Sequence, residues 1–144
     1  MQWIVVFDTN ILISALLSLR GSPFRCLALA KEQIVQSVTC QEILHEFQEK
    51  LEVKFDYSPL HARAAADEVR KLSQLVAITN ALKVIKADPD DDKVLECAVV
   101  GGATHIVTGD HHLLPLGSYK GISIVTAADF LTLVSTFASF SSLL

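Results

Sequence analysis

The sequence predicts an α/β fold in which helices wrap a central parallel sheet as an α/β/α sandwich. Short apolar runs rich in β-branched residues recur along the chain and indicate strands. Segments with helical spacing separate these runs, and strands that alternate with helices favour a parallel sheet. At 144 residues the chain has the length of a single domain. We expect its core to span residues 3–134, before an apolar, serine-rich C-terminal tail.

Five apolar runs predict the strands. The first run is continuous and β-branched, as expected of a strand that is covered on both faces. The stretch that follows residue 75 is ambiguous and indicates one short strand near its end. The expected strands are residues 3–7, 34–38, 82–85, 105–108 and 122–125.

Capping residues and prolines place the helices between the strands. A Ser-Pro pair suits the N-cap and first turn of a helix, and such pairs stand at residues 22–23 and 58–59. Thr39 and Glu42 have the spacing of a capping box. Thr126 and Asp129 repeat this spacing near the C-terminus. The expected helices are residues 10 onward, 22–32, 39–52, 58–75, 90–100 and 126 onward.

Composition narrows the class of protein. Apolar residues make up 51% of the chain and charged residues 19%, which excludes a disordered chain. The net charge of −4 provides no basic surface for holding nucleic acid by phosphate neutralisation alone. A nucleic-acid substrate would therefore need bound cations in the pocket. Three widely spaced cysteines lie in apolar patterns and are expected to be reduced core residues: Cys26, Cys40 and Cys97.

The apolar N-terminus does not have the form of a signal peptide. Asp8 and Asn10 interrupt it, and no basic segment precedes it. No apolar stretch approaches the roughly 20 residues that a membrane helix needs. We therefore expect a cytoplasmic protein without membrane association.

Four acidic residues occur where a divalent metal site is expected. Asp8 and Asp110 follow predicted strands, and Glu46 and Asp91 lie on predicted helices. In an open α/β sheet, ligands bind beyond the carboxyl ends of the strands. Carboxylates crowded at that edge repel one another unless cations compensate. Because oxygen ligands are preferred by Mg²⁺ and Mn²⁺, the sequence predicts a site for one of these ions.

Helix geometry selects Asp91 from the acidic run 88–92. Steps of three, four and seven residues from Asp91 reach the apolar face of its helix. A step of four from Asp92 reaches Glu96, on the face that we expect to meet solvent. Asp91 is therefore expected to point inward at a helix N-terminus, which favours its ionised form. Asp88 and the other acids of the run also fit helix caps, outer groups of a metal site or a solvated turn.

Two of the candidate acids have structural alternatives. Glu46 lies at the edge of the apolar stripe of its helix, whereas Glu42 points further away, so we favour Glu46 and keep Glu42 open. Asp8 also fits a helix N-cap. Thr9 can orient the Asp8 carboxylate, and Asn10 can cap the helix in its place.

Polar residues also surround Asp110. Thr108 supplies a hydroxyl near the predicted pocket, although an ordinary Asp at the end of a strand has the same pattern. His111 and His112 invite a transition-metal interpretation, but a third spaced His or Cys is missing.

Five segments match a known family in its order. They are V-V-F-D-T-N-I-L-I-S-A-L, R-G-S-P, E-I-L-H-E-F, D-P-D-D-D-K-V-L-E-C-A and A-T-H-I-V-T-G-D-H-H-L-L. The D-T-N and V-T-G-D pieces are the most specific. With these segments the chain resembles the PIN-domain ribonucleases, and among them the toxin components of bacterial and archaeal type II toxin–antitoxin systems. The third segment departs from the family, because many relatives have a small residue before its second Glu and Leu after it.

This resemblance implies hydrolysis of single-stranded RNA by a Mg²⁺- or Mn²⁺-dependent enzyme. It implies that the ion is held by Asp8, Glu46, Asp91 and Asp110. Thr108 and Asn10 match supporting positions of the family. An RNA substrate and a cognate antitoxin are the implied partners, and the apolar helices and tail favour a homodimer. Our candidates for contact with the RNA backbone are Arg20, Arg25 and Lys50.

Two alternatives stay open. A phosphoaspartyl enzyme or receiver module also places an Asp after its first strand. However, the phosphatase pattern of two Asp residues two apart is missing, because residue 10 is Asn. The stronger alternative is a PIN-like domain that keeps its acids but binds RNA or protein without cutting. Metal-dependent RNA cleavage distinguishes this alternative from a nuclease.

Overall fold

The computed structural model of the chain describes residues 2–82 and 90–142. Its elements are β1 (Ile4–Phe7), α1 (Thr9–Leu17), α2 (Ser22–Lys31), β2 (Gln36–Cys40), α3 (Gln41–Phe55), α4 (Pro59–Lys71), β3 (Ser73–Val76), α5 (Asp90–Val100), β4 (His105–Val107), the 3₁₀ helix η1 (Leu114–Leu116), β5 (Ser118–Tyr119), β6 (Ile122–Val125) and α6 (Ala127–Ser142). In this part of the chain the strands form one sheet in the order β3-β2-β1-β4-β6-β5. All neighbours are parallel except β5 and β6. The predicted α/β class is confirmed, with a short antiparallel strand added at one edge.

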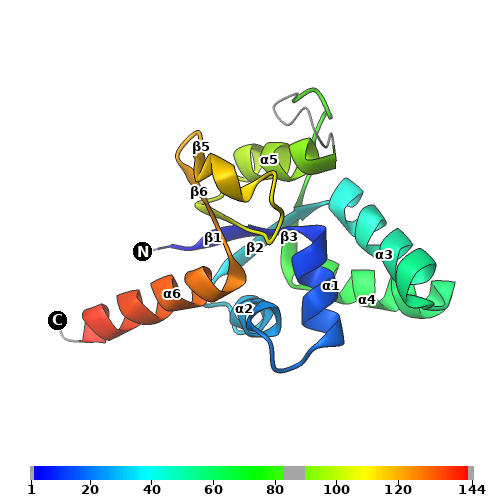
Figure 1. Ribbon diagram of the computed structural model, residues 1–144, viewed down its shortest axis with the longest axis horizontal. Coiled ribbons are helices and arrows are strands. Elements are labelled where there is room, and N and C mark those ends of the chain that lie inside the picture. Colours follow the sequence, from blue (N-terminus) through cyan, green and yellow to red (C-terminus); the bar gives the residue numbers. More distant parts are fainter. Residues whose placement is uncertain (1, 83–89, 143–144) are drawn as a thin grey trace.

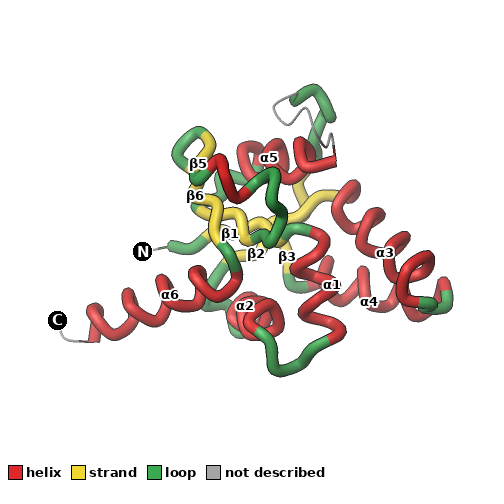
Figure 2. The backbone as a smooth tube through the Cα atoms, in the orientation of Figure 1, coloured by secondary structure: helices red, strands yellow, loops and turns green. Residues whose placement is uncertain are grey.

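Helices cover both faces of this sheet (Figure 1). Helix α5 packs on β1, β2 and β4, and it lies on the opposite side of the sheet from α1 and α2 (Figure 2). On that other side α1 packs against α2, and α2 against α6, whose C-terminal end extends away from the body. The central strands are therefore covered on both faces, and Val5, Val6 and Val38 are fully buried.

The register of β1 and β4 determines where the polar residues leave the sheet. The two strands are parallel, and Phe7 pairs with Val107. The backbone N–H of Asp8 donates to the carbonyl of Val107 at 3.0 Å. Asp8 and Thr108 are the residues that directly follow these two strands. They consequently lie side by side at the carboxyl edge of the sheet, where ligands bind in open α/β sheets.

The second strand begins two residues later than the prediction of residues 34–38. The backbone N–H groups of Ile34 and Val35 both bond to the carbonyl of Leu29, which extends the turn after α2. Thr39 therefore lies inside β2, where it pairs with Leu75 of β3. The predicted capping box at Thr39 is wrong, since the N-cap of α3 is Cys40, which offers no side-chain hydrogen bond.

The third strand also differs from the prediction. Leu82 lies in a loop, and the rest of the predicted strand 82–85 falls outside the described residues. The strand is instead β3, in a segment where the spacing predicted a continuing helix, and α4 ends at Lys71. Pairing with β2, together with a 2.7 Å hydrogen bond between the Ser37 and Ser73 hydroxyls, stabilises β3 through contacts that local periodicity does not contain.

Two other capping predictions are confirmed. The Ser58 hydroxyl accepts from the backbone N–H of His61 at 3.1 Å, and the Thr126 hydroxyl accepts from that of Asp129 at 3.1 Å. The three cysteines are buried and form no disulfide, as predicted. No single helix in residues 2–82 and 90–142 has the length and apolarity to cross a membrane; only α1 and α2 taken together, with a bend of 98° between them, pass on length and composition.

Candidate active site

Hydrogen bonds join Asp8, Thr108 and Asp110 at the carboxyl ends of β1 and β4. The Thr108 hydroxyl donates to Asp8 Oδ2 at 2.7 Å and accepts from the backbone N–H of Asp110 at 3.0 Å. Thr108 is fully buried, so its hydroxyl is held between these two partners. Asp8 and Asp110, which are far apart in the sequence, are thus linked through the Thr108 side chain. Their proximity was expected, because each follows a predicted strand of the same parallel sheet.

Asp8 also caps α1. Its Oδ1 accepts from the backbone N–H of Thr9 at 2.7 Å, and its backbone is extended as an N-cap requires. The cap and the site are therefore combined in one residue. Thr9 orients the carboxylate through its backbone and not through its hydroxyl, whose oxygen is buried without a hydrogen-bond partner among the described residues. Asn10 lies in the first turn, exposed, and the prediction that it caps the helix is wrong.

The Asp8 carboxyl lies among other negative charges. Burial raises its pKa above the ordinary value, and the hydrogen bonds from Thr108 and Thr9 offset only part of this effect. The carboxylates of Glu46 and Asp110 raise the pKa further. These acids, which come from three different elements, thus lie close enough to repel one another, and a bound cation would relieve that repulsion.

Asp110 is held in its ionised form by the turn that follows it. Its Oδ1 accepts from the backbone N–H groups of His112 at 2.7 Å and of Leu113 at 3.3 Å. Burial acts to raise the pKa of Asp110, but these bonds, a hydrogen bond with the Asp91 carboxyl and the nearby His112 ring hold it below its ordinary value. Asp91 is buried in the first turn of α5, as its position on the apolar face predicted. His112 lies between the two acids, with Nδ1 at 3.7 Å from Asp91 Oδ2 and at 3.7 Å from Asp110 Oδ1.

Glu46 approaches the same region from α3 between two lysines. Lys50 Nζ lies 3.0 Å from Glu46 Oε1, and Lys93 forms an ion pair with Oε2. Burial would raise the pKa of Glu46, but the two ammonium groups, Lys93 foremost, hold it below its ordinary value. Glu42 instead accepts a hydrogen bond from the Asn80 side chain at 3.0 Å. The structure therefore favours Glu46 as the helix carboxylate that faces Asp8.

Lys93 was not among the predicted site residues. It follows three aspartates directly and lies in a segment that matches the family, but the sequence alone assigned it no role. Its side chain is only 15% exposed. One sequence signal could have drawn attention to Lys93. It lies in the first turn of the same helix as Asp91, a candidate metal ligand.

The acids Asp92 and Glu96 correct a second prediction. Both were expected on the solvent face of α5, yet they are 6% and 8% exposed. Glu96 Oε2 accepts from the backbone N–H groups of Thr79 and Asn80 and from the Thr79 hydroxyl, and Oε1 accepts from the N–H of Leu82. Against the effect of burial, these donors hold the pKa of Glu96 below its ordinary value. The loop 79–82 covers a helix face that periodicity alone predicts to be exposed.

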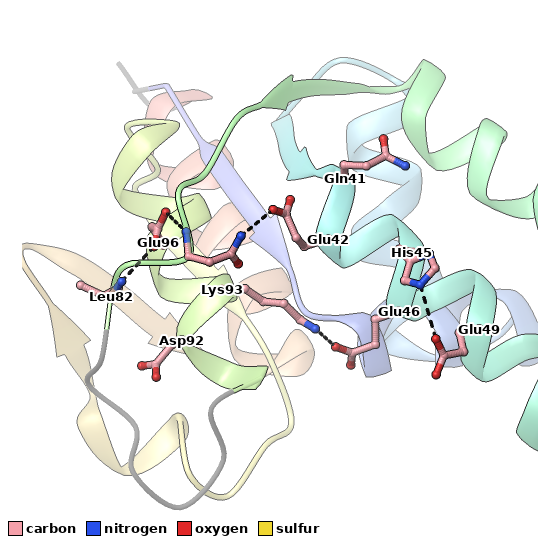
Figure 3. Close-up of a pocket in the computed structure, with 10 residues that line it drawn as sticks. Gln41, Glu42, His45, Glu46, Glu49, Leu82, Asp92, Lys93 and Glu96 are labelled. Carbon is pink, nitrogen blue, oxygen red and sulfur yellow. Dashed lines mark hydrogen bonds and ion pairs between the residues drawn. The ribbon is translucent and has the colours of Figure 1, made fainter.

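A pocket of about 620 Å³ opens between α3, the loop 79–82 and α5 (Figure 3). The residues that line it are Gln41, Glu42, His45, Glu46, Glu49, Asn80, Leu82, Asp92, Lys93 and Glu96. Asp8, Asp91 and Asp110 are not among these residues. The pocket is therefore a compartment beside the acidic cluster (Asp8, Glu46, Asp91 and Asp110), and Glu46 and Lys93 stand at the boundary.

Of the other candidates, the two arginines are not joined to the cluster, whereas Lys50 is. Arg20 and Arg25 are exposed, in the turn after α1 and on α2. In residues 2–82 and 90–142, no hydrogen bond or ion pair links either arginine to the four acids. Asp88 falls outside the described residues. Lys50, also a candidate for RNA contact, pairs with Glu46 one turn away on its own helix.

The donor set fits a divalent cation. Two carboxylates, Glu46 and Asp110, act on Asp8, whose pKa is raised mainly by burial and further by these two negative charges. Among the described residues, the three ligands whose atoms all lie within 4.8 Å of one another are Asp110, His111 and His112, and no three of the four acids lie this close together. Carboxylate oxygens supplemented by an imidazole nitrogen suit hard and borderline divalent ions.

Residues 4–112 match the family model of the PIN domain. The matched segment includes all four acids of the cluster. The chain belongs to the PIN domain family. PIN domains are generally nucleases.

Individual relatives agree with this assignment. The uncharacterized protein MJ1680 of Methanocaldococcus jannaschii is 32% identical over 120 residues, which cover 78% of this chain and 74% of that protein. VapBC2 from Rickettsia felis, solved bound to a DNA fragment from its promoter, has a similar structure with a TM-score of 0.59 at 14% identity, over 84% of this chain and 96% of that chain. The PIN domain of T. brucei RRP44 has a TM-score of 0.50 at 13% identity, over 100% of this chain and 88% of that one. The two structures confirm the predicted PIN-like architecture.

Proposed function

We propose that this PIN domain protein is a metal-dependent endoribonuclease that hydrolyses phosphodiester bonds of single-stranded RNA. The observation that carries the proposal is the hydrogen-bonded line from Asp110 through Thr108 to Asp8 at the carboxyl ends of two parallel strands. Asp91 and Glu46 approach the two ends of this line from separate helices. Such a cluster of acids is costly to assemble unless a cation is bound there.

The acids Asp8, Asp91, Asp110 and Glu46 would hold Mg²⁺ or Mn²⁺. A divalent ion at such a site polarises a phosphate oxygen and brings the pKa of a bound water toward neutrality. The chain itself supplies the orientation. Thr108 fixes the Asp8 carboxylate, and the backbone N–H groups after Asp110 keep that carboxylate ionised and directed into the cluster. Asp110 is then the group that orients the attacking water.

We also assign the protein the role of a toxin, paired with a cognate antitoxin, in the cytoplasm. Its sequence segments support this role, and the fold resembles that of VapBC2. Large apolar side chains stay exposed around the end of α1 and the start of α2, and on α6: Leu16, Leu17, Leu19, Phe24, Leu133 and Phe137. Surfaces of this kind are commonly covered by a partner, and an antitoxin and a second copy of the chain are the proposed ones.

The test is cleavage of a labelled, mixed-sequence single-stranded RNA by the purified protein with Mg²⁺ or Mn²⁺. We expect cutting that EDTA abolishes and that Asp8→Asn removes. Asp67→Asn is the matched control, because it makes the same change on an exposed residue of α4 and should cut like the wild type. A well-folded wild-type protein that binds RNA but cuts none with either ion would replace the nuclease with an RNA-binding module.

A further inference from the structure

Two histidines follow Asp110 in the turn after β4. Among the described residues, the ligand atoms of Asp110, His111 and His112 all lie within 4.8 Å of one another. The two rings stack with their centroids 4.1 Å apart. Two imidazole rings therefore lie beside a carboxylate of the acidic cluster, although the four candidate ligands of that cluster are all carboxylates.

His112 is the ring that faces the acids. Its Nδ1 lies 3.7 Å from Asp110 Oδ1 and 3.7 Å from Asp91 Oδ2, so it stands between a carboxylate of the turn after β4 and one of α5. Bonds of about 2.0–2.2 Å to one divalent ion place its ligand atoms at most about 4.4 Å apart. Nδ1 is therefore within reach of an ion that either carboxylate binds.

The backbone holds this ring in place. The His112 N–H donates to Asp110 Oδ1 at 2.7 Å, and the Asp110 N–H donates to the Thr108 hydroxyl at 3.0 Å. Thr108 in turn donates to Asp8. The turn that orients the Asp110 carboxylate thus also sets the position of His112, and a ligand that is fixed by its surroundings is preorganised for metal binding.

Two roles fit an imidazole between two acids. A protonated ring is a counter-charge, and its N–H donates to a carboxylate at about 2.7–2.9 Å. A neutral ring instead presents a lone pair to a cation that the carboxylates share. Nδ1 of His112 is closed to solvent and, among the described residues, has no hydrogen-bond partner. Because both acids lie beyond hydrogen-bond distance from Nδ1, the geometry favours the role of ligand.

We propose that His112 Nδ1 is a ligand of the divalent ion at the acidic cluster, and that this nitrogen makes the site select Mn²⁺ over Mg²⁺. Mg²⁺ demands oxygen ligands in near-ideal octahedral geometry, whereas first-row transition-metal ions also bind imidazole nitrogen. The inference rests on the proposed metal-dependent nuclease and names the ion that it uses. It adds a ligand that the set of four acids does not contain.

Metal binding to the full chain, without a histidine tag and without RNA, tests this ligand. Calorimetric titrations give the Kd for Mn²⁺ and for Mg²⁺, and the wild type should bind Mn²⁺ at least about tenfold more tightly. His112→Phe keeps an aromatic ring beside His111 but removes the nitrogens. It should weaken Mn²⁺ binding by about tenfold or more and change the Kd for Mg²⁺ by less than about threefold. His61→Phe, the same change on an exposed residue of α4, should keep both values.

The two roles of His112 predict opposite results. Loss of a counter-charge would leave the acids with more net negative charge, so His112→Phe would bind both ions more tightly, and that outcome overturns the proposal. His112→Asn is measured beside it in case the Phe variant does not fold. It should also lower the preference for Mn²⁺ over Mg²⁺.

Pulsed electron paramagnetic resonance of the bound Mn²⁺ gives a second readout, which a merely structural role of His112 would not change. The wild type should show hyperfine coupling to a nitrogen nucleus, and His61→Phe should keep it. His112→Phe should lose it. A wild type that cuts RNA with Mn²⁺ but shows no nitrogen coupling overturns the role of His112 alone, as does a coupling that persists in His112→Phe. A wild type that binds neither ion overturns the proposed metal-dependent nuclease and this inference together.

Discussion

Asp8 and Glu96 are both nearly inaccessible to solvent, at 6% and 8% exposure, but Asp8 lies deep in the protein and Glu96 lies near its surface, and their pKa values shift in opposite directions. Glu96 accepts three backbone N–H groups and a hydroxyl, all from the loop 79–82. Asp8 accepts one N–H and one hydroxyl, and two further carboxylates act on it. Low exposure alone therefore does not mark a functional acid. The depth of burial, the hydrogen-bond donors and the neighbouring negative charges together set the direction of each pKa shift.

This balance separates two tasks. The donors around Glu96 make it an anchor that ties the loop 79–82 to α5 and forms one wall of the pocket. The deficit of donors around Asp8 leaves a carboxylate whose charge a bound cation would compensate. A perturbed acid among like charges at a strand end is the pattern associated with functional sites.

The largest expected difference between the two acids concerns metal binding. Asp8→Asn should lower RNA cleavage by at least about 100-fold, because it removes an anionic ligand of the proposed metal site. It should also abolish the rise in Tm that Mn²⁺ produces in the wild type by binding the native state. The Glu96→Gln variant, measured under conditions where it is folded, should still show an increase in Tm when Mn²⁺ is added. Thermal melts with and without Mn²⁺ measure both, and an equal response of the two variants would contradict the division of tasks.

The next effect concerns the free energy of unfolding, which the two substitutions should change in different directions. Glu96→Gln replaces a carboxylate by an amide whose N–H₂ faces backbone donors, so unfolding should become easier by about 2–3 kcal/mol. Asp8→Asn relieves repulsion and should leave Tm unchanged or raised. Urea unfolding at neutral pH gives both values. The control is Glu42→Gln, which affects one hydrogen bond to the Asn80 side chain and should cost less than about 1 kcal/mol. A loss of stability in Asp8→Asn as large as that in Glu96→Gln would refute the comparison.

Sequence patterns could predict Asp8, Asp110 and Asp91 because each depends on local signals. An acid that follows a buried strand, or that lies on the apolar face of a helix, has its direction determined within a few residues. The position of Glu96 depends on the loop 79–82, which lies 14 to 17 residues before it and covers α5, and helical periodicity carries no information about such a cover. The same limit applies to β3, whose backbone partners in β2 outweighed a local helical pattern. Lys93 was missed because its significance lies in Glu46, which belongs to another helix.

The dependence of stability on pH sharpens the comparison. The pKa of Glu96 is lowered on folding, so its contribution to stability is complete above its unfolded value of about 4.3 and is lost as pH falls through the folded value. The pKa of Asp8 is raised, so the folded state takes up its proton more readily, and this uptake offsets part of the loss as pH falls through that raised value. Glu96→Gln should therefore flatten the fall in stability below about pH 4.3, and Asp8→Asn should steepen the fall above about pH 3.9. Urea unfolding at several pH values, without metal, measures the slopes. Equal slopes in all three proteins would contradict the opposite shifts.

The smallest expected effect comes from the hydroxyl that links Asp8 to Asp110. Thr108→Val keeps the shape of a fully buried side chain but removes the donor to Asp8 Oδ2 and the acceptor for the Asp110 N–H. The variant should lose on the order of 1 kcal/mol of stability. Because the ionised form of Asp8 loses a hydrogen bond, its pKa should rise further. The acid limb of the pH–rate profile for RNA cleavage should then move upward by roughly half a unit to one unit. Thr108→Ser retains the hydroxyl and should keep the wild-type limb even if the missing methyl group lowers Tm. If the Val and Ser variants have the same acid limb in their pH–rate profiles, the Thr108 hydroxyl does not control the ionisation of Asp8.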